Sequence, residues 1–413
     1  MTISAYFSRA GNRRRLHDGP LGVFIDAYAA RLVGEGYRRS TAWRSLRLVG
    51  DFSRWLERHR LGAGDVDERV AATFLAERAG YRHPQTSDRP TLHKLLAVLR
   101  EAGVAAPPKP AEVNARERIF NDFAGYLARD RGLVPRTIIR HWPPVRLFLQ
   151  EAGVEAIDDF ARLDQAAIIG FVERHARDHS PATAKGLCWA LRAFLRYLRR
   201  QGWTSIDLAG SVPTVRRWRQ TSLPTYLSPE QIQQVLTGCD RETPTGRRDF
   251  AILMLLARLG LRANEVTTLT LDAIDWRSGQ VLIDGKGRQR VAMPLPADVG
   301  AAIASYLRDG RPRSDSRRVF LRQDAPHVGF ATAASVFVVA NAALTRAGIQ
   351  GFAHMGAHLF RHSLATALLR SGASLTEIGQ VLRHRDPDTT RLYAKVDIDT
   401  LRRLGAAWPG GRP

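Results

Sequence analysis

The stretch of sequence that decides the fold is residues 356–396, GAHLFRHSLATALLRSGASLTEIGQVLRHRDPDTTRLYAKV. Apolar residues recur there every three or four positions in two runs, which predicts helices over 359–370 and 375–381. Residues 331–347, nearer the N-terminus, have the same periodicity. This end of the chain is therefore predicted to be mostly helical.

Polar side chains with chemical uses are set into this helical pattern. His358 and Arg361 are three residues apart, so we expect them to project from one face of a helix. Asp386-Pro387-Asp388 is a helix start, and Tyr393 lies about two turns into the helix that it opens. His384 comes just before that start. Spacing alone brings no residue from an earlier segment to this group.

Two further candidates lie upstream. Arg262 belongs to Gly260-Leu261-Arg262-Ala263-Asn264-Glu265, directly after a buried helix predicted over 250–259. Lys286 stands between two glycines, in a turn that joins two predicted strands. The apolar residues that mark these strands are Val281, Ile283, Val291 and Met293. Ser228-Pro229-Glu230 predicts the start of an earlier helix, with a capping serine and a proline at the first helical position.

Together these residues carry the functional groups that phosphoryl transfer without a metal ion requires. The candidate catalytic residues are Arg262, Lys286, His358, Arg361, His384 and Tyr393. Guanidinium groups match the non-bridging oxygens of a phosphodiester and offset the charge that develops in a pentacoordinate transition state. A phenol can be the nucleophile and form a phosphotyrosine. Because the ordinary pKa of a phenol is about 10, nearby cations or a base must help to remove its proton.

Each candidate also has a simpler interpretation. A single arginine in so basic a chain is most often a solvated surface charge, and a lone tyrosine at helical spacing is usually a core aromatic. His354, His358 and His362 are four residues apart, as metal ligands on a helix can be. No His-Glu-x-x-His pattern is present and Gly356 weakens a helix there, so no metal site is predicted.

Residues 227–396 resemble the catalytic domain of the tyrosine recombinases, the phage-integrase family of site-specific DNA recombinases. The motifs that carry the resemblance are Gly260-Leu261-Arg262 with Glu265, Gly285-Lys286-Gly287, His358-Leu359-Phe360-Arg361-His362-Ser363, and Leu382-Arg383-His384 followed by Tyr393. As an ordered set they are highly specific. Two positions depart from the family pattern: Arg383 stands where glycine is common, and Phe360 where leucine is common. Residues 111–215 resemble the family's helical core-binding domain less distinctly.

The resemblance implies a role for each candidate. Tyr393 would attack the scissile phosphate, leaving a 3′-phosphotyrosine and a free 5′-hydroxyl. Arg262 and Arg361 would clamp the phosphate, and Lys286 would protonate the leaving oxygen. The two histidines of the set would assist proton transfer and hydrogen-bond the phosphate. Because the bond energy is kept in the phosphotyrosine ester, the reaction needs no ATP, metal or other cofactor.

The composition fits a folded protein that binds nucleic acid. The 413 residues are 44% apolar and carry a formal net charge of +22, which suits nucleic acid or an anionic membrane surface. Only five of the 62 basic residues are lysines, a skew that GC-rich coding could also produce. Cys188 and Cys239 cannot form a disulfide framework, which favours a reducing compartment. No signal peptide or membrane span is predicted, so we expect a cytoplasmic, nucleoid-associated bacterial protein.

The first 200 residues contain a predicted internal duplication. An offset of 96 pairs Phe24, Asp26, Gly36, Thr41, Arg44 and Phe52 with Phe120, Asp122, Gly132, Thr137, Arg140 and Phe148. An offset of 99 then pairs Leu96, Leu99 and Gly103 with Leu195, Leu198 and Gly202. Chance similarity between two helix-rich segments is the alternative.

The predicted fold class is mainly α, with helical N-terminal domains and an α-rich catalytic domain that contains a small antiparallel sheet. A proline-rich stretch near residue 108 reads as a linker. The predicted domains are an N-terminal DNA-binding or assembly domain over 1–106, a core-binding domain over 111–212 and a catalytic domain over 226–413. Residues 213–225 form a second predicted linker.

Two basic groups are predicted to contact DNA. Arg216, Arg217 and Arg219 surround Trp218 in the second linker and suit a strap across a phosphate backbone, although a solvated connector fits equally well. Arg288 and Arg290 follow Lys286 and are expected to contact DNA beside it.

We therefore predict a site-specific recombinase of a mobile element that acts on double-stranded DNA carrying specific recombination sites. The resemblance implies a homo-tetramer on synapsed DNA. Accessory or sister recombinases are further candidate partners, and no membrane partner is predicted. A type IB topoisomerase with the same chemistry and a non-catalytic DNA-binding protein that kept the fold are the alternatives. An intact catalytic set argues against the second, because a binding protein has no need for both Tyr393 and Lys286.

Overall fold

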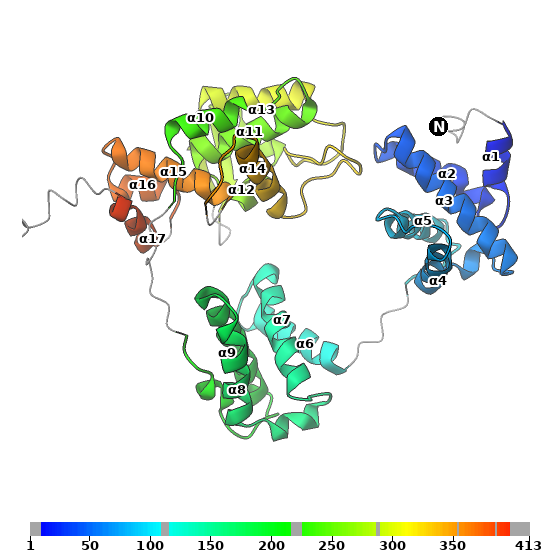
Figure 1. The fold of residues 1–413 in the computed structure, drawn as a ribbon, viewed down its shortest axis with the longest axis horizontal. Coiled ribbons are helices and arrows are strands. Elements are labelled where there is room, and N and C mark those ends of the chain that lie inside the picture. Colours follow the sequence, from blue (N-terminus) through cyan, green and yellow to red (C-terminus); the bar gives the residue numbers. More distant parts are fainter. Residues whose placement is uncertain are drawn as a thin grey trace, which may run out of the picture. The chain divides into compact units, whose positions relative to one another are not determined.

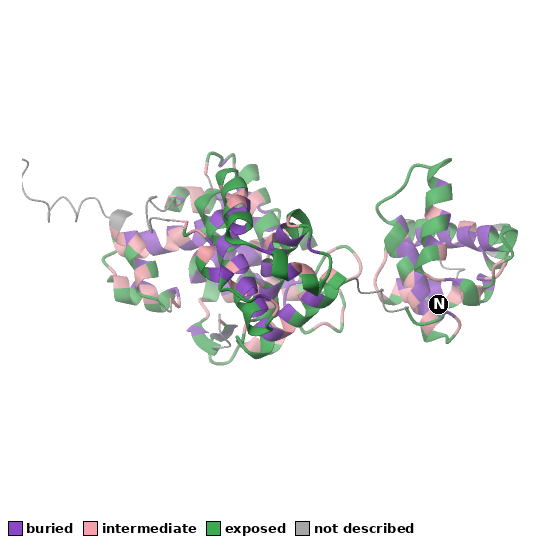
Figure 2. Ribbon diagram, turned by 90° about the horizontal axis from the view of Figure 1, so that it is seen from below, coloured by how far each residue is buried: buried purple, intermediate pink, exposed green. Residues whose placement is uncertain are grey.

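The structure is a computed structural model that describes residues 10–108, 115–215, 225–285, 290–352, 355–384 and 386–396. Within these ranges the chain is mainly helical and has one three-stranded antiparallel sheet, so the predicted fold class is confirmed. Figure 1 follows the elements along the chain. Figure 2 shows that buried residues form the inner sides of the helices.

Residues 10–108 form a helical body around its own hydrophobic core. Its elements are α1 (Ala10–His17), η2 (Gly22–Phe24), α2 (Ile25–Gly34), α3 (Arg39–Arg58), η3 (Ala63–Asp65), α4 (Glu68–Ala79) and α5 (Asp88–Glu101). The buried residues of α3 recur every three or four positions, so the helix is amphipathic. Phe52 of α3 packs on Phe74 of α4 with ring centroids 4.8 Å apart, which joins the two helices in one core.

Residues 115–215 form a second helical body, and Pro108–Thr221 is a compact unit of its own. Its elements are α6 (Ala115–Arg129), α7 (Pro135–Glu151), η4 (Ile157–Arg162), α8 (Gln165–Arg177), α9 (Pro181–Arg200) and η5 (Leu208–Ser211). Ser180 caps α9 by accepting a hydrogen bond from Thr183 N, with Pro181 at the first helical position. Phe123 of α6 meets Phe194 of α9 edge to face, with ring centroids 5.2 Å apart.

The two bodies share helix order and burial pattern. At an offset of 96, Ala42, Ser45, Val49 and Phe52 of α3 are buried, as are Ile138, His141, Val145 and Phe148 of α7. Gly103 and Gly202 both have positive φ angles, of 70° and 73°, just beyond α5 and α9. This agreement supports the predicted duplication.

One part of the predicted pairing does not match the burial pattern. The offset of 96 places buried Ile25 of α2 opposite exposed Asn121 of α6. The buried residues correspond instead at an offset of 94, which pairs Ile25, Ala29 and Leu32 with Ile119, Phe123 and Tyr126. At the offset of 94, α6 ends one residue later than α2, and the loop after α6 (130–134) is one residue longer than the loop after α2 (35–38). Together these two residues restore the offset of 96 at Gly36 and Gly132.

Residues 225–396 form the third body, built on the largest hydrophobic cluster in the part of the chain that the structure describes. Its first elements are α10 (Pro229–Thr237), α11 (Pro244–Leu259), α12 (Ala263–Thr268), η6 (Leu271–Ala273), β1 (Ile274–Asp275), β2 (Gln280–Asp284), β3 (Arg290–Pro294) and α13 (Ala297–Asp309). The rest are α14 (Ala334–Arg346), α15 (Ala357–Arg370), α16 (Leu375–Val381), α17 (Asp388–Arg391) and η7 (Leu392–Val396). α11 is buried almost all round and packs on α13 and α15.

The sheet has the order β1-β2-β3, with Val281 of β2 opposite Met293 of β3. The two predicted strands are therefore present, and β1 adds a third that was not predicted. Val291 is 36% exposed, whereas Val281, Ile283 and Met293 are buried. Residues 286–289, which include the predicted turn lysine, lie outside the described residues.

Candidate active site

The second arginine of the candidate set lies inside the protein, on α15. Arg361 is only 4% exposed, because the helix buries this face against α11. Its guanidinium donates hydrogen bonds to the carbonyl oxygens of Gly260 and Leu382. Gly260 ends α11 in the left-handed conformation, with φ of 56°, which glycine adopts without strain. Arg361 thus ties the end of α11 to the turn after α16.

The first arginine meets that same turn. Arg262 is the residue before α12, and its backbone N–H donates to Glu265 Oε2 at 2.9 Å. Its guanidinium donates to Glu265 Oε1 at 2.7 Å and to the carbonyl oxygen of Arg383 at 3.3 Å. The structure therefore brings Arg262 and Arg361 together at the backbone of residues 382 and 383, a meeting that sequence spacing could not predict.

Arg383, the departure from the family pattern, belongs to this network. Its guanidinium donates to Glu265 Oε2 at 2.9 Å, and the side chains of both residues are almost fully buried. Its φ angle is 56°, a conformation that favours glycine. Burial raises the pKa of the Glu265 carboxyl, but Arg383 and then Arg262 outweigh that effect and hold the pKa below its usual range. Glu265 is thus an ionised bridge between two arginines.

The candidate nucleophile is buried beside a histidine. Tyr393 is 2% exposed and packs with Ala365, Ile378 and Leu382. Its hydroxyl lies 2.9 Å from Nδ1 of His362, a hydrogen bond that joins η7 to α15. α17 ends at Arg391, so Tyr393 lies in the 3-10 turn that follows and not in the α-helix that was predicted.

His384 lies on another side of the same phenol. The two rings are nearly parallel, at 4°, with centroids 6.4 Å apart. Nδ1 of His384 is 2.7 Å from the hydroxyl of Thr390, in the short helix α17. Burial, followed by the charges of Arg361 and Arg262, lowers the pKa of His384 to about 4. His384 is therefore neutral at physiological pH.

The electrostatics of the site favour a bound anion. Burial, and then the charges of Arg262 and Arg383, lower the pKa of Arg361 to about 10, so this group is still charged at neutral pH. Among the described residues no carboxylate forms an ion pair with it, and its hydrogen bonds go to carbonyl oxygens. Burial raises the pKa of Tyr393 to about 12, although the nearby Arg361 and Arg262 act against this rise. A phosphate would neutralise the arginines.

The other predicted site residues divide into two groups. His358 is on the exposed side of α15, with its ring centroid 6.4 Å from that of His362. Arg290 is exposed and pairs with Asp284 across the strands, at 2.9 Å. The predicted residues outside the described part of the chain are Arg216, Arg217, Arg219, Lys286 and Arg288.

Two functional candidates were missed as site residues in the sequence. His362 entered as one of three histidines at metal-ligand spacing and within a family motif, without a role of its own, yet its partner is Tyr393. Glu265 was noted within a motif without a role, and the capping spacing of three residues from Arg262 was the available signal. Within the described residues there is no cluster of three or more potential metal ligands, and His354 lies outside them.

Comparisons with known proteins show the family to which this chain belongs. The model of the phage integrase family matches residues 225–399. The integrase/recombinase y4rA of Sinorhizobium fredii is 40% identical over 395 residues, which is 95% of this chain and 96% of that protein. The chain belongs to the phage integrase family. This tyrosine recombinase is a site-specific DNA recombinase, which catalyses DNA breakage and rejoining.

Solved structures show the same fold as this recombinase. XerH bound to palindromic difH substrate, in a post-cleavage complex, has a TM-score of 0.54 and 19% identity, covering 86% of this chain and 94% of XerH. A lambda integrase tetramer bound to a Holliday junction has a TM-score of 0.51 and 12% identity, covering 79% of this chain and 87% of that one. Within its described residues, the recombinase has no helix that is both long enough and apolar enough to cross a membrane.

Proposed function

We propose that this recombinase cuts each DNA strand with the hydroxyl of Tyr393. The phenolic oxygen attacks phosphorus and forms a new P–O bond, while the bond to the 5′-oxygen breaks with its electron pair. The products are a 3′-phosphotyrosine and a 5′-hydroxyl. Attack by the 5′-hydroxyl of a partner strand reverses the step and exchanges the strands.

The hydrogen bond between Tyr393 and His362 carries this proposal. At 2.9 Å, a neutral His362 can accept the phenolic proton through Nδ1. A pKa of about 12 means that the phenol is protonated until a base and the nearby cations act together. Neutral His384, whose ring lies parallel to the phenol, would hydrogen-bond the phosphate or take part in proton transfer.

The other groups complete the reaction. Arg262 and Arg361 would bind the non-bridging oxygens, where charge increases in the transition state. Lys286 would give its proton to the departing 5′-oxygen, which leaves poorly as an alkoxide. His358 would assist from the exposed side of α15. These assignments follow the motif positions, and the meeting of Arg262 with Arg361 at one turn supports them.

We further propose that the recombinase acts as a tetramer on two DNA sites and serves a mobile element. The lambda integrase assembly on a Holliday junction, which shares the fold, supports the tetramer. The core-binding domain over 111–212 and the catalytic domain over 226–413 would each bind the duplex. The N-terminal body exceeds what a minimal two-domain recombinase needs, which fits an element with its own DNA ends.

The test is a substitution that removes one oxygen atom. Tyr393→Phe should bind DNA but form no covalent adduct with a labelled, nicked duplex that carries the element's own end, as seen on a denaturing gel. Tyr226→Phe and Tyr306→Phe are the controls, and both should keep the adduct. An adduct that persists in Tyr393→Phe would assign the nucleophile to another residue.

A further inference from the structure

The first body of the recombinase has a basic surface that the cleavage chemistry does not use. Helix α3 buries one side in the core and exposes the other. On its exposed side lie Arg39, Trp43, Arg47, Arg54 and Arg58. At 100° per residue these five positions fall within an arc of about 100°, along a helix about 30 Å long, and the exposed Ser40 and Glu57 lie in the same arc. We call them the α3 stripe.

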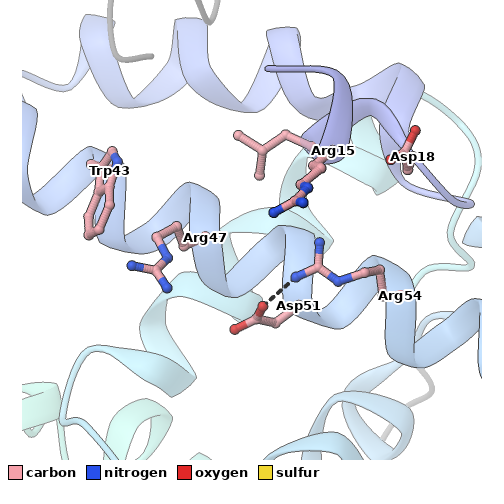
Figure 3. A pocket seen from close by; sticks show the side chains of 7 residues that line it. Arg15, Asp18, Trp43, Arg47, Asp51 and Arg54 are labelled. Carbon is pink, nitrogen blue, oxygen red and sulfur yellow. Dashed lines mark hydrogen bonds and ion pairs between the residues drawn. The ribbon is translucent and has the colours of Figure 1, made fainter. Parts of the chain in front are cut away.

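A hollow of about 630 Å³ lies beside the α3 stripe, next to α1. In Figure 3 the guanidiniums of Arg15 and Arg54 extend toward each other, that of Arg47 lies on the Trp43 side, and Asp51 bonds to Arg54. Leu16, Asp18 and Trp43 complete the lining. Three arginines and two aspartates thus leave the hollow with an excess of positive charge.

The ion pairs in this region do not neutralise the stripe. Asp51 is shared, because Arg54 lies 2.6 Å and Arg82 3.9 Å from its carboxylate oxygens. Arg47 has its guanidinium 4.6 Å from the centre of the Trp43 ring, a cation–π contact and not an ion pair. In the described residues no carboxylate pairs with Arg39 or Arg47. Guanidinium groups gathered on one surface repel one another, and a bound anion relieves this repulsion.

The second body shows that the repeated fold does not require the α3 stripe. At the offset of 96 that aligns the buried residues of α3 and α7, the stripe positions correspond to Pro135, Ile139, Pro143, Gln150 and Val154. None of these five is basic, although the buried face is the same. The stripe therefore belongs to the first body alone.

We propose that the α3 stripe and the adjoining hollow bind the phosphate backbone of a DNA duplex, as a surface additional to the cleavage site. About 30 Å of duplex carries roughly 18 negative charges, so a linear array of arginines matches it better than it matches a small anion. Arginine forks bind phosphate oxygens, and Trp43 keeps Arg47 extended at the surface. The proposal rests on the action of the recombinase on DNA, but it does not depend on Tyr393 as the nucleophile.

The test measures DNA binding by the full chain in the absence of cleavage. The variant that tests the surface, called the stripe variant, is Arg15→Gln, Arg47→Gln and Arg54→Gln together. It removes two arginines of the α3 stripe and Arg15, which lines the adjoining hollow. The matched control is Arg60→Gln, Arg69→Gln and Arg89→Gln, which removes the same charge from exposed positions of the same body that do not line the hollow. The probe is a 40-base-pair duplex of arbitrary sequence, titrated between 50 and 200 mM KCl.

The stripe variant should have a log–log salt slope that is shallower by about 2 to 3, and the control a slope changed by less than 1. Between the two salt concentrations the unmodified protein should then lose about 40-fold more affinity than the stripe variant. Ultraviolet crosslinking to the probe, followed by mass spectrometry, should recover the peptide that contains Trp43.

Equal slopes for the two variants would overturn the proposal, because only general charge would then matter. An unchanged slope in the stripe variant would also overturn it and would assign the stripe to an acidic protein segment. Adduct formation by the unmodified chain tests Tyr393 separately, so the two proposals can fail independently.

Discussion

At the scale of single residues, Arg383 combines a backbone conformation that costs free energy with a buried ion pair that it supplies. A non-glycine residue at φ of 56° costs about 1–3 kcal/mol. Removing one partner of a buried pair costs about 3–5 kcal/mol where the other charge is left alone. Glu265 would keep its ion pair with Arg262, so we expect the loss of Arg383 to cost about 3 kcal/mol, at the low end of that range, and still to outweigh the strain.

This difference predicts the order of stability of two variants. Arg383→Gly loses the ion pair but relieves the backbone, whereas Arg383→Ala loses the pair and keeps the strain. Both should be less stable than the unmodified protein, with Arg383→Ala about 1 kcal/mol below Arg383→Gly in urea denaturation. If Arg383→Gly equals the unmodified protein in stability, the pair contributes no net free energy.

A second prediction at this scale concerns the pH dependence of stability. His384 has a pKa of about 4 in the folded protein and about 6.5 when unfolded, so the unfolded state binds more protons between these values. Stability should therefore fall as the pH falls through this window, by about 2 kcal/mol between pH 7 and pH 5.

Unfolding by urea at pH 7 and pH 5 measures this fall directly. His384→Gln cannot titrate and should lose about 2 kcal/mol less than the unmodified protein over the same interval. A parallel loss in both proteins would contradict the assignment to His384. The lowered pKa of Glu265 acts below pH 4.5 and so does not contribute to this comparison.

The sequence proposed several residues of the candidate site but not their contacts. Arg262, Arg361, His384 and Tyr393 follow from motifs, because each motif keeps its order along the chain. Their common anchor is the backbone at residues 382 and 383, and no periodicity encodes a bond from α12 or α15 to that turn. The role of Glu265 also needed the structure, since its second partner is 118 residues away.

At the scale of elements, helix caps offer a test of the repeated architecture. Asp67 accepts a hydrogen bond from Val70 N at the start of α4, and Asp164 accepts one from Ala167 N at the start of α8, both at 2.7 Å. Replacing either by alanine should cost about 1 kcal/mol, because one N–H of the first turn loses its acceptor.

Thermal unfolding of Asp67→Ala and Asp164→Ala measures these costs, with Asp67→Asn and Asp164→Asn as controls. Asparagine caps helices about as well as aspartate, so each control should stay within a few tenths of a kcal/mol of the unmodified protein. Equal losses for alanine and asparagine would show that the negative charge at the helix start, and not the cap hydrogen bond, stabilises these helices.

Most helices of the third body were predictable from periodicity, and two exceptions are instructive. α16 has the predicted bounds, whereas α11 begins at Pro244, six residues before the apolar run that indicated it, because Thr243 supplies a cap. α13 was missed although Val299, Ile303 and Tyr306 are buried at helical spacing. Its alanines and glycine dilute the apolar pattern that makes a helix stand out.

At the scale of the whole molecule, each body has its own hydrophobic cluster. The hydrophobic cluster of the first body runs from Leu16 to Ala105. Every described residue of the candidate active site lies beyond residue 250. Removing residues 1–110 should therefore leave a folded protein that still forms the covalent adduct on a nicked site.

Circular dichroism and the denaturing-gel assay together check this expectation. The shortened protein should also bind DNA less tightly, since the α3 stripe is lost with the first body. Aggregation of the shortened chain would show that the first body shares a core with the rest, and the proposed domain boundary would then be wrong.

Burial of Tyr393, the proposed nucleophile, has a consequence for the safety of the host chromosome. With Tyr393 only 2% exposed, a molecule in this conformation presents no phenolic hydroxyl to DNA of unrelated sequence. If Tyr393 is the nucleophile, the phenol must leave its apolar contacts with Ala365, Ile378 and Leu382 before it can attack a phosphate. A protein with this much positive charge can therefore bind many unrelated DNA sequences without cleaving them.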